Sequence, residues 1–268
     1  MATQFYPEAD VSPPSLLLAL TELPRAIAEL TSLAPAAPLL AMSKRGDGHP
    51  VMVLPGFVTS DISTTLLRRF LTGLGYHTHA WELGRNLGPK AIGWEGEKLI
   101  ARLDEIHHET GKRVSLIGWS LGGVMARQLS RRLPDAVRQV ISLGSPFAGT
   151  PKATNVWRAY EMLTGQKIDD HATREQLRES ATAPPVPSTA IYTKEDGIVA
   201  WQNCVEPRGA ETDNIEVHGS HGSHCGLGVN PAVLYAVADR LAQDEGDWHP
   251  FERESGLRPL VYPFAGHA

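Results

Sequence analysis

The stretch Gly-Trp-Ser-Leu-Gly-Gly at residues 118–123 decides how the rest of this 268-residue chain is interpreted. The apolar run at residues 114–117 is typical of a buried strand, and residues 124–133 carry apolar side chains at helical spacing. A serine between a strand and a helix predicts a tight, strained turn that exposes its hydroxyl above the edge of a sheet. Glycines two positions before and after it are expected because a side chain there would collide with the neighbouring strand and helix. We therefore interpret Ser120 as a candidate nucleophile.

The composition is that of a globular protein and argues against a nucleic-acid-binding or membrane-spanning one. Hydrophobic residues make up 42% of the chain, charged residues 21%, and the formal net charge is −5. These values are ordinary for a globular protein and indicate no basic surface for nucleic acid. No apolar run approaches the roughly 18 residues that a membrane span needs. Residues 16–20 are apolar, but no Lys or Arg precedes them, which argues against a secretory signal and predicts a cytoplasmic protein.

Short apolar runs alternate with helical patterns through most of the chain. This alternation predicts an α/β fold with a parallel sheet of about six strands and helices on both faces. The expected strands are residues 50–54, 76–81, 114–117, 137–143, 189–192 and 214–218. The expected helices between and after them are residues 62–74, 94–109, 121–132 and 231–243.

Two segments depart from the alternation. Residues 146–185 contain two helical patterns and no strand, which predicts a helical cap inserted over the sheet edge that carries Ser120. Near the N-terminus, apolar residues recur every three or four positions, which predicts an amphipathic helix broken at Pro24 and Pro35 and packed on the main body. Its apolar stripe consists of Leu16, Leu20, Leu23, Ile27 and Leu30. The expected parts are an N-terminal helical segment (1–47), a core (48–145 and 186–243), the cap (146–185) and an extended tail (244–268).

An acidic residue and a histidine follow the last two strands. In a parallel sheet the ligand crevice lies at the carboxyl ends of the strands, so these residues are expected near Ser120. Asp196 is favoured over Glu195 because Gly197 and apolar residues follow it, so its carboxylate is able to turn inward. His224 is favoured as the base over His218 and His221 because it lies nearest the last helix. The order Ser120, Asp196, His224 is that of one of the folds that host a Ser-His-Asp triad.

Backbone groups near Ser120 complete the candidate site. An oxyanion hole requires two N–H donors, and Leu121 and Phe57 are the candidates because one follows the nucleophile and the other follows the first strand. Gly56 is expected to allow the backbone to approach closely there. Phe57, Trp119 and Val199 are candidates for contacting the substrate, and side chains of the cap could extend an apolar acyl site. These are Val156, Trp157, Tyr160, Met162 and Leu163.

The histidines and cysteines admit other interpretations. His218, His221 and His224 recur every three residues beside Cys225, but this spacing on a Gly-rich loop does not place their rings on one face, so a metal site is disfavoured. Cys204 and Cys225 flank the sixth expected strand, and the sequence leaves open whether they form a disulfide bond.

With these residues in place, the chain resembles the α/β-hydrolase superfamily, and within it the bacterial lipases and carboxylesterases. The resemblance covers about residues 48–243 and is carried by residues 50–57, 118–123, 195–199 and 223–231. Residues 224–227 are similar to the catalytic-histidine loop of small bacterial lipases, which supports His224 over His221. The first oxyanion loop departs from the family, because many members have His-Gly where this chain has Pro-Gly-Phe at residues 55–57.

The resemblance implies a serine ester hydrolase, either an esterase or a lipase, that acts on an ester or lipid through an acyl-enzyme. It implies neither a metal nor an organic cofactor. The alternatives are an acyltransferase with the same triad, or a ligand-binding scaffold without catalysis, because a fold does not fix a function. The sequence does not determine the oligomeric state.

Overall fold

The computed structural model describes residues 11–150, 152–167, 171–218, 222–256 and 258–263. Its strands are β1 (Pro50–Leu54), β2 (His77–Ala80), β3 (Val114–Trp119), β4 (Val137–Leu143), β5 (Ser188–Tyr192) and β6 (Thr212–Glu216). Its helices up to the fourth strand are α1 (Leu16–Leu20), α2 (Glu22–Ala41), α3 (Thr65–Leu74), α4 (Pro89–Ile92), α5 (Glu97–Thr110) and α6 (Leu121–Arg132). The later helices are α7 (Trp157–Thr164), α8 (His171–Ala181), η1 (Trp201–Cys204), η2 (Leu227–Val229), α9 (Pro231–Leu241) and α10 (Arg258–Val261).

The six strands form one parallel sheet in the order β2-β1-β3-β4-β5-β6. The predicted six-stranded parallel sheet is confirmed, with strand boundaries that differ by at most two residues. The strand order reverses between β1 and β3, so the loops after these two strands diverge and leave a crevice at their carboxyl ends. Ser120 follows β3 at this point.

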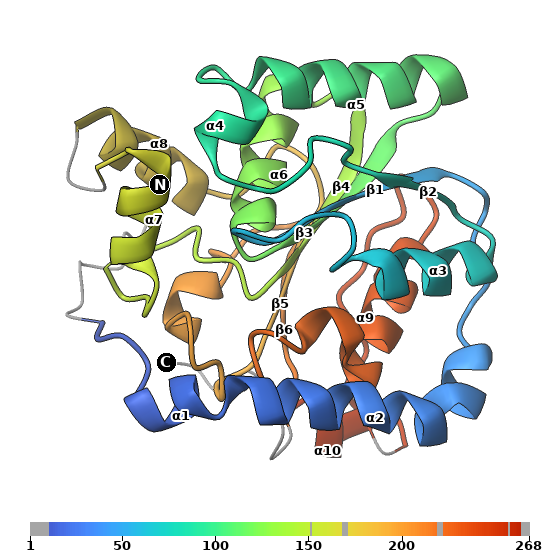
Figure 1. Ribbon diagram of the computed structural model, residues 1–268. Coiled ribbons are helices and arrows are strands. Elements are labelled where there is room, and N and C mark those ends of the chain that lie inside the picture. The colour runs from blue at the N-terminus through green and yellow to red at the C-terminus, as the bar shows by residue number, and fades with distance from the viewer. Residues whose placement is uncertain (1–10, 151, 168–170, 219–221, 257, 264–268) are drawn as a thin grey trace.

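Helices cover both faces of the sheet, and alternate residues of each strand supply the two cores. Val51 and Val53 of β1 face α3 and α9, whereas Met52 and Leu54 face α5 and α6. Figure 1 shows α5 and α6 on one side of the sheet and α3 and α9 on the other. Burial on both faces explains why β1, β4 and β5 are buried along their whole length.

The N-terminal helices do not break where the prolines predict. The chain bends at Thr21, between α1 and α2, and α2 then continues through Pro24 and Pro35. Pro24 lies in the first turn of α2, where a backbone N–H has no helical acceptor, so it costs no hydrogen bond. Pro35 does remove one, but the neighbouring turns of the helix are held because Leu33, Ala36 and Leu40 pack into the core.

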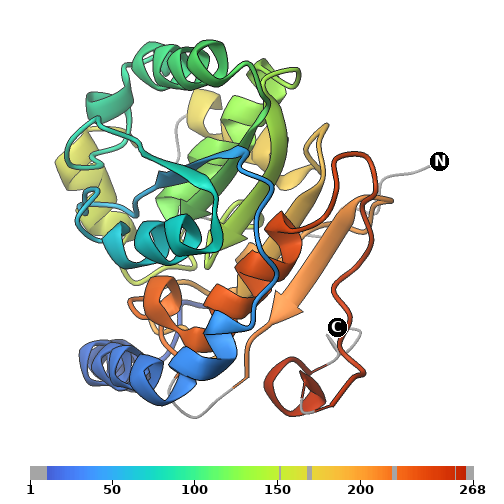
Figure 2. The same cartoon turned by 90° about the vertical axis from the view of Figure 1, so that its right-hand side faces the viewer.

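The predicted apolar stripe of this segment faces outward. Leu20 is 81% exposed and Leu23 is 69% exposed, whereas the carboxylates of Glu22 and Glu29 are buried. Helix α2 lies alongside α9, as Figures 1 and 2 both show, and it also contacts η2. The N-terminal half of α2 therefore buries its polar face, which is the reverse of the expected orientation. No helix in the described part of the chain is long and apolar enough to cross a bilayer.

Two segments lie outside the sheet and its flanking helices. Helices α7 and α8 follow β4 and lie beyond the end of the sheet that carries Ser120 (Figure 1). The segment after α9 runs back along β6 (Figure 2), where the backbone N–H of Phe251 donates to Asp213, and it includes the short helix α10.

Candidate active site

Ser120 occupies a strained turn between β3 and α6. Its φ of 51° and ψ of −120° lie in a region that non-glycine residues rarely adopt. Its backbone N–H donates to the carbonyl of Leu143 at 2.8 Å, which ties the turn to the end of β4. The side chain consequently stands at the N-terminus of α6, where the helix dipole favours negative charge.

The glycines around Ser120 are required by close packing. A β-carbon at Gly118 would overlap the backbone of Gly123 in α6, and one at Gly122 would lie 2.5 Å from the carbonyl oxygen of Leu54. Helix α6 thus packs directly on β3 and β1. Gly56 is different, because a β-carbon there would reach Ser120 Cβ only at 3.5 Å, an ordinary contact. The expected need for Gly56 is therefore not observed.

Asp196 and His224 form a buried pair. Asp196 lies in the acid loop, residues 193–200, and His224 lies in the histidine loop, residues 222–230. The carboxylate oxygen Oδ2 of Asp196 is 2.6 Å from Nδ1 of His224. The other oxygen accepts the backbone N–H groups of Ile198 and Val199 at 2.8 and 2.7 Å. Both oxygens of Asp196 are therefore engaged, and one fixes the orientation of the imidazole.

The other acids and histidines lie elsewhere. Glu195 accepts a hydrogen bond from the Thr193 hydroxyl rather than from His224. His218 is exposed, and its backbone donates to the carbonyl of Val261. His221 lies outside the described residues. Within the described ranges, no group of three or more His, Cys, Asp or Glu side chains is arranged to hold a metal ion. Cys204 and Cys225 are both free thiols.

The environment of His224 changes its basicity. Burial lowers the pKa of His224, but the charge and hydrogen bond of Asp196 and the charge of Glu22 outweigh it, so the pKa is raised above its ordinary value. A histidine with this environment is a stronger proton acceptor than a free one. The proton that it holds on Nδ1 faces Asp196, which leaves Nε2 as the acceptor.

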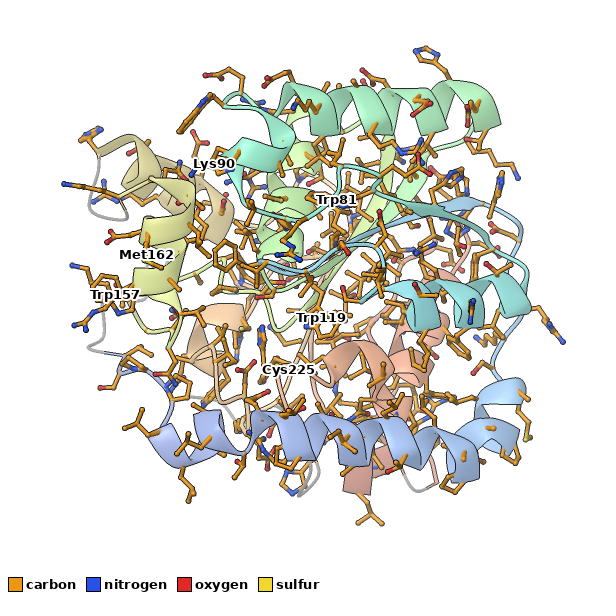
Figure 3. All side chains as sticks on the ribbon, viewed as in Figure 1. Trp81, Lys90, Trp119, Trp157, Met162 and Cys225 are labelled. Atoms are coloured by element: carbon orange, nitrogen blue, oxygen red, sulfur yellow. The ribbon has the colours of Figure 1, made fainter. Side chains whose placement is uncertain are left out.

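Trp119 connects the serine turn to the histidine loop. Its indole Nε1 donates to the carbonyl of His224 at 3.0 Å, and its ring packs against Gly228. Figure 3 shows Trp119 close to the Cys225 end of this loop. Among the described residues, however, no hydrogen bond joins the Ser120 hydroxyl to His224. The structure therefore brings Asp196 and His224 into contact, and it joins Trp119, the residue before Ser120, to the histidine loop.

Two backbone N–H groups near Ser120 have no acceptor. In the described part of the chain, the N–H of Leu121 and the N–H of Phe57 make no hydrogen bond. The loop that carries Phe57 is fixed by Asn86, a fully buried residue whose side chain donates to Pro55 and whose carbonyl accepts from Val58. Val58 has a φ of 57°, a strained value for a β-branched residue. The loop that carries the Phe57 N–H is thus fixed by hydrogen bonds on either side of Phe57, whereas the Leu121 N–H belongs to the first turn of α6.

A cavity of about 360 Å³ opens beside Ser120. It lies between α4, α5, α6 and α7. Most of its lining residues are apolar, and charged residues such as Glu95, Arg131 and Glu179 also line it. The apolar lining residues include Phe57, Ile92, Leu99, Val124, Met125 and Val199. Its size falls within the range of small-molecule sites.

Only some of the residues that the sequence predicts to contact the substrate line this cavity. Phe57 and Val199 line it, and so do Val156, Trp157 and Tyr160 of the α7 region. Trp119 is not among its lining residues, because its indole is turned toward the histidine loop. Met162 and Leu163 are turned away, and Met162 is 77% exposed on the outer side of α7 (Figure 3). Lys90 of α4 donates to the carbonyl of Leu163 at 2.6 Å and so joins α7 to the opposite wall.

Several residues that shape the site are not predicted from the sequence. Asn86 lies in a loop with no motif, and Gly144 is a single glycine after β4. A β-carbon at Gly144 would lie 3.2 Å from Nδ1 of His224 and 3.3 Å from Asp196. Glu22 and Glu29 of α2 contact the histidine loop. Their spacing of seven residues places both on one face of a helix, and this spacing is the signal that could have indicated a buried polar face.

Solved structures share this architecture. Aspergillus fumigatus lipase B aligns with 76% of this chain at 20% identity and a TM-score of 0.56, and the chain covers 54% of the lipase B chain. A monoacylglycerol lipase from Paleococcus ferrophilus aligns with 74% of this chain and over 96% of its own length, at 15% identity and a TM-score of 0.52. An α/β superfamily hydrolase from Oenococcus oeni PSU-1 aligns with 72% of this chain and 91% of its own, at 16% identity and a TM-score of 0.50.

These likenesses define the fold of the chain. It is the α/β-hydrolase fold, as the sequence predicts. No protein-family model matches the sequence, and a search of curated proteins finds no match.

Proposed function

We propose that the protein is a serine hydrolase of carboxylic esters. The observation that carries this proposal is the strained turn that presents Ser120 to an apolar cavity beside the buried Asp196–His224 pair. Backbone strain and a buried acid–histidine pair are both costly, and both are expected at a site of covalent catalysis.

In the first half of the proposed reaction, the Ser120 hydroxyl attacks the ester carbonyl. A bond forms between Oγ and the carbonyl carbon, and the hydroxyl proton passes to Nε2 of His224. Asp196 accepts the Nδ1 proton in a hydrogen bond and stabilises the imidazolium. The free N–H groups of Leu121 and Phe57 donate to the oxyanion, which contributes the largest share of the stabilisation in such sites.

In the second half, the tetrahedral intermediate collapses. The bond to the leaving oxygen breaks, His224 gives its proton to the departing alcohol, and an acyl group remains on Ser120. Water then attacks the acyl-enzyme with His224 again as the base, and the acid is released. The residues of the chain suffice for every proton transfer in this sequence.

The cavity supports an apolar acyl group as the substrate moiety. Its wall consists mainly of aliphatic and aromatic side chains, and Phe57 contributes both a free N–H and a ring packed 5.3 Å from that of Tyr160. We propose that residues 146–185 act as a cap, because Val156, Trp157 and Tyr160 close one side of this cavity.

Hydrolysis of nitrophenyl esters from acetyl to palmitoyl tests the proposal. We expect the wild-type protein to hydrolyse part of the series and Ser120→Ala to lose at least about 10³-fold in kcat, since the nucleophile is removed. Ser255→Ala, the same change at an exposed serine distant in sequence, is the matched control and is expected to retain full activity. The optimal chain length then distinguishes an esterase from a lipase.

Activity of Ser120→Ala near the wild-type rate would contradict the proposal. Formation of a new ester when an alcohol is added, at the expense of the free acid, would indicate an acyltransferase with the same residues. Absence of turnover in the wild-type protein with every ester would favour a ligand-binding scaffold.

A further inference from the structure

We propose that Glu22 of α2 is a positioning residue that clamps the acid loop and the histidine loop in their reactive arrangement. This inference rests on the proposed function and adds to it a residue from outside the sheet and its loops. Glu22 touches neither the cavity nor the Ser120 hydroxyl, so any effect on the reaction passes through Asp196 and His224.

One carboxylate joins the two loops. Glu22 is 4% exposed, and its Oε1 accepts the backbone N–H of Gly197 at 2.7 Å and that of His224 at 3.1 Å. Its Oε2 accepts the N–H of Cys225 at 2.9 Å. Gly197 is the residue after Asp196, so the clamp acts on the backbone directly beside both members of the pair.

Arg25 reinforces the clamp from the carbonyl side. Its guanidinium lies 3.1 Å from Glu22 and donates to the carbonyl of Glu195 at 2.6 Å and to that of Gly222. These carbonyls belong to the same two loops. The cation also compensates the buried charge of Glu22, which would otherwise be costly to remove from water.

Glu29, two turns further along α2, binds both the first part and the last residue of the histidine loop. Its carboxylate accepts hydrogen bonds from the Ser223 hydroxyl and from the side-chain amide of Asn230, the latter at 2.7 Å. Asn230 caps α9 by accepting from Ala232 at 2.8 Å. The histidine loop is therefore held at both ends by one face of α2.

The glycines of the two loops fit this docking. A β-carbon at Gly226 would overlap the Glu29 carboxylate, and one at Gly197 would overlap the carbonyl of Leu18 in α1. Both loops thus approach the N-terminal helices to a distance that only glycine permits.

The orientation of α2 shows that polar contacts decide its packing. An amphipathic helix that served only to cover the core would bury its leucines. In the N-terminal half of α2, however, Leu23 and Ile27 are exposed, while Glu22 and Glu29 point inward. An apolar side chain in place of Glu22 would leave three backbone N–H groups of the two loops without their acceptor.

Glu22→Gln provides the test, because it keeps the size of the side chain and removes its charge and one acceptor oxygen. The active sites of wild type and variant are first counted by complete reaction with an organophosphonate, and kcat is then expressed per counted site. We expect kcat per site to fall about 10²-fold, as for a small misplacement of a catalytic group, with KM within about twofold of wild type. Glu245→Gln, at an exposed glutamate paired with Arg113, is the matched control and is expected to match wild type.

The pH profile of kcat/KM gives a second readout. It would stay unchanged if Glu22 served only to stabilise the fold. The charged groups that act on His224 are Asp196 from the acid loop and Glu22 from α2, with Arg25 beside Glu22. Removing the charge of Glu22 is expected to lower the pKa of His224 and to shift the acid limb of kcat/KM to lower pH.

Two results would overturn the inference. One is a Glu22→Gln protein with fewer countable sites but an unchanged kcat per site and pH profile, which would assign Glu22 to folding alone. The other is an unchanged kcat per site with full site occupancy. If Glu22→Gln does not fold, Glu22→Asp is judged by the same criteria, with a smaller expected loss. Failure of the proposed function itself would be recognised separately, because the wild-type protein would then show no ester turnover through Ser120.

Discussion

The proposed reaction depends on how His224 is held against Asp196. The imidazole is buried, its Nδ1 is committed to a carboxylate at 2.6 Å, and its pKa is raised above the ordinary value because of the negative charges around it. A base with a raised pKa is protonated, and so inactive, over a wider range of acidic pH. The pH dependence of the reaction is therefore a direct consequence of this geometry.

The first prediction concerns Asp196→Asn. We expect kcat to fall about 10⁴-fold, because the amide would favour the wrong imidazole tautomer. The residual activity should show an acid limb at lower pH than wild type, since the charge that raises the pKa of His224 is gone. Profiles of kcat/KM between pH 5 and 9 check this, with Glu195→Gln as the control at the neighbouring carboxylate. A loss of activity in Glu195→Gln but not in Asp196→Asn would contradict this prediction and would assign the role of the acid to Glu195.

At the element scale, loops after different strands converge because each is braced by a buried polar group. Asn86 braces the loop after β1, and Glu22 with Arg25 braces the loops after β5 and β6. A third buried group is Arg127 of α6, which forms an ion pair with Glu206, after η1. Its guanidinium also donates to the carbonyls of Ser180 and Thr182 at the end of α8. Each brace joins segments that are far apart in sequence.

Asn86→Ala tests the brace on the Phe57 loop. We expect kcat to fall about 10²-fold, the low end of the cost of losing an oxyanion donor, because the loop would no longer hold its N–H in place. Asn214→Ala is the matched control, since its amide also makes two hydrogen bonds to backbone, both to Glu206, away from Ser120. Steady-state kinetics of both variants decide the matter. Equal and small effects on kcat would contradict a role of Asn86 in the site.

Arg127→Ala tests the ion pair beneath the α8 region. Both partners are fully buried, so loss of the cation leaves Glu206 as an uncompensated charge, and we expect a loss of about 3–5 kcal/mol in the free energy of unfolding. The double variant Arg127→Met/Glu206→Leu is expected to recover most of it, because an apolar pair avoids the buried charge. Urea unfolding measures all three proteins. A loss below about 1 kcal/mol in the single variant would be that of an exposed pair and would contradict this role.

The elements themselves show what the sequence can and cannot predict. The strands are found because burial on both faces leaves continuous apolar runs such as residues 50–54 and 137–143. Ser120, Asp196 and His224 are predicted to lie near one another because parallel strands bring their carboxyl ends to one edge, and their catalytic roles stay a prediction. The orientation of α2 is mispredicted because the pattern rule assumes that leucines turn inward, whereas Glu22 binds backbone groups more than 170 positions away. Contacts between residues so far apart in the sequence produce no pattern in the local sequence.

For the molecule as a whole, stability is expected to depend on two histidines outside the site, the buried His49 and the half-buried His79. Burial, together with the positive charges of His77 and Arg102, lowers the pKa of His79 in β2 to about 4. Burial also lowers the pKa of His49, which lies just before β1. In the unfolded chain both groups titrate near their ordinary pKa of about 6.5. Between these values the unfolded state binds protons that the folded state does not, so stability falls as pH decreases.

The corresponding prediction is a pH-dependent unfolding midpoint. We expect the urea midpoint of the wild-type protein to decrease from pH 7.5 to pH 4.5, and His79→Gln to reduce that decrease because it removes one titrating group. His218→Gln, at an exposed histidine, serves as the control and should follow wild type. An identical slope in wild type and His79→Gln would show that His79 does not contribute to the dependence.

In the proposed mechanism Ser120 forms the covalent intermediate, and trapping that intermediate on the protein tests this role. The protein is incubated with a fluorophosphonate, which transfers a stable phosphonyl group to a serine activated by a histidine. Peptide mass spectrometry then locates the adduct. We expect one adduct per chain on the peptide that contains Ser120, and none on Ser120→Ala or, at the same exposure, on His224→Ala. Turnover of esters without an adduct at Ser120, or an adduct at another serine, would contradict it.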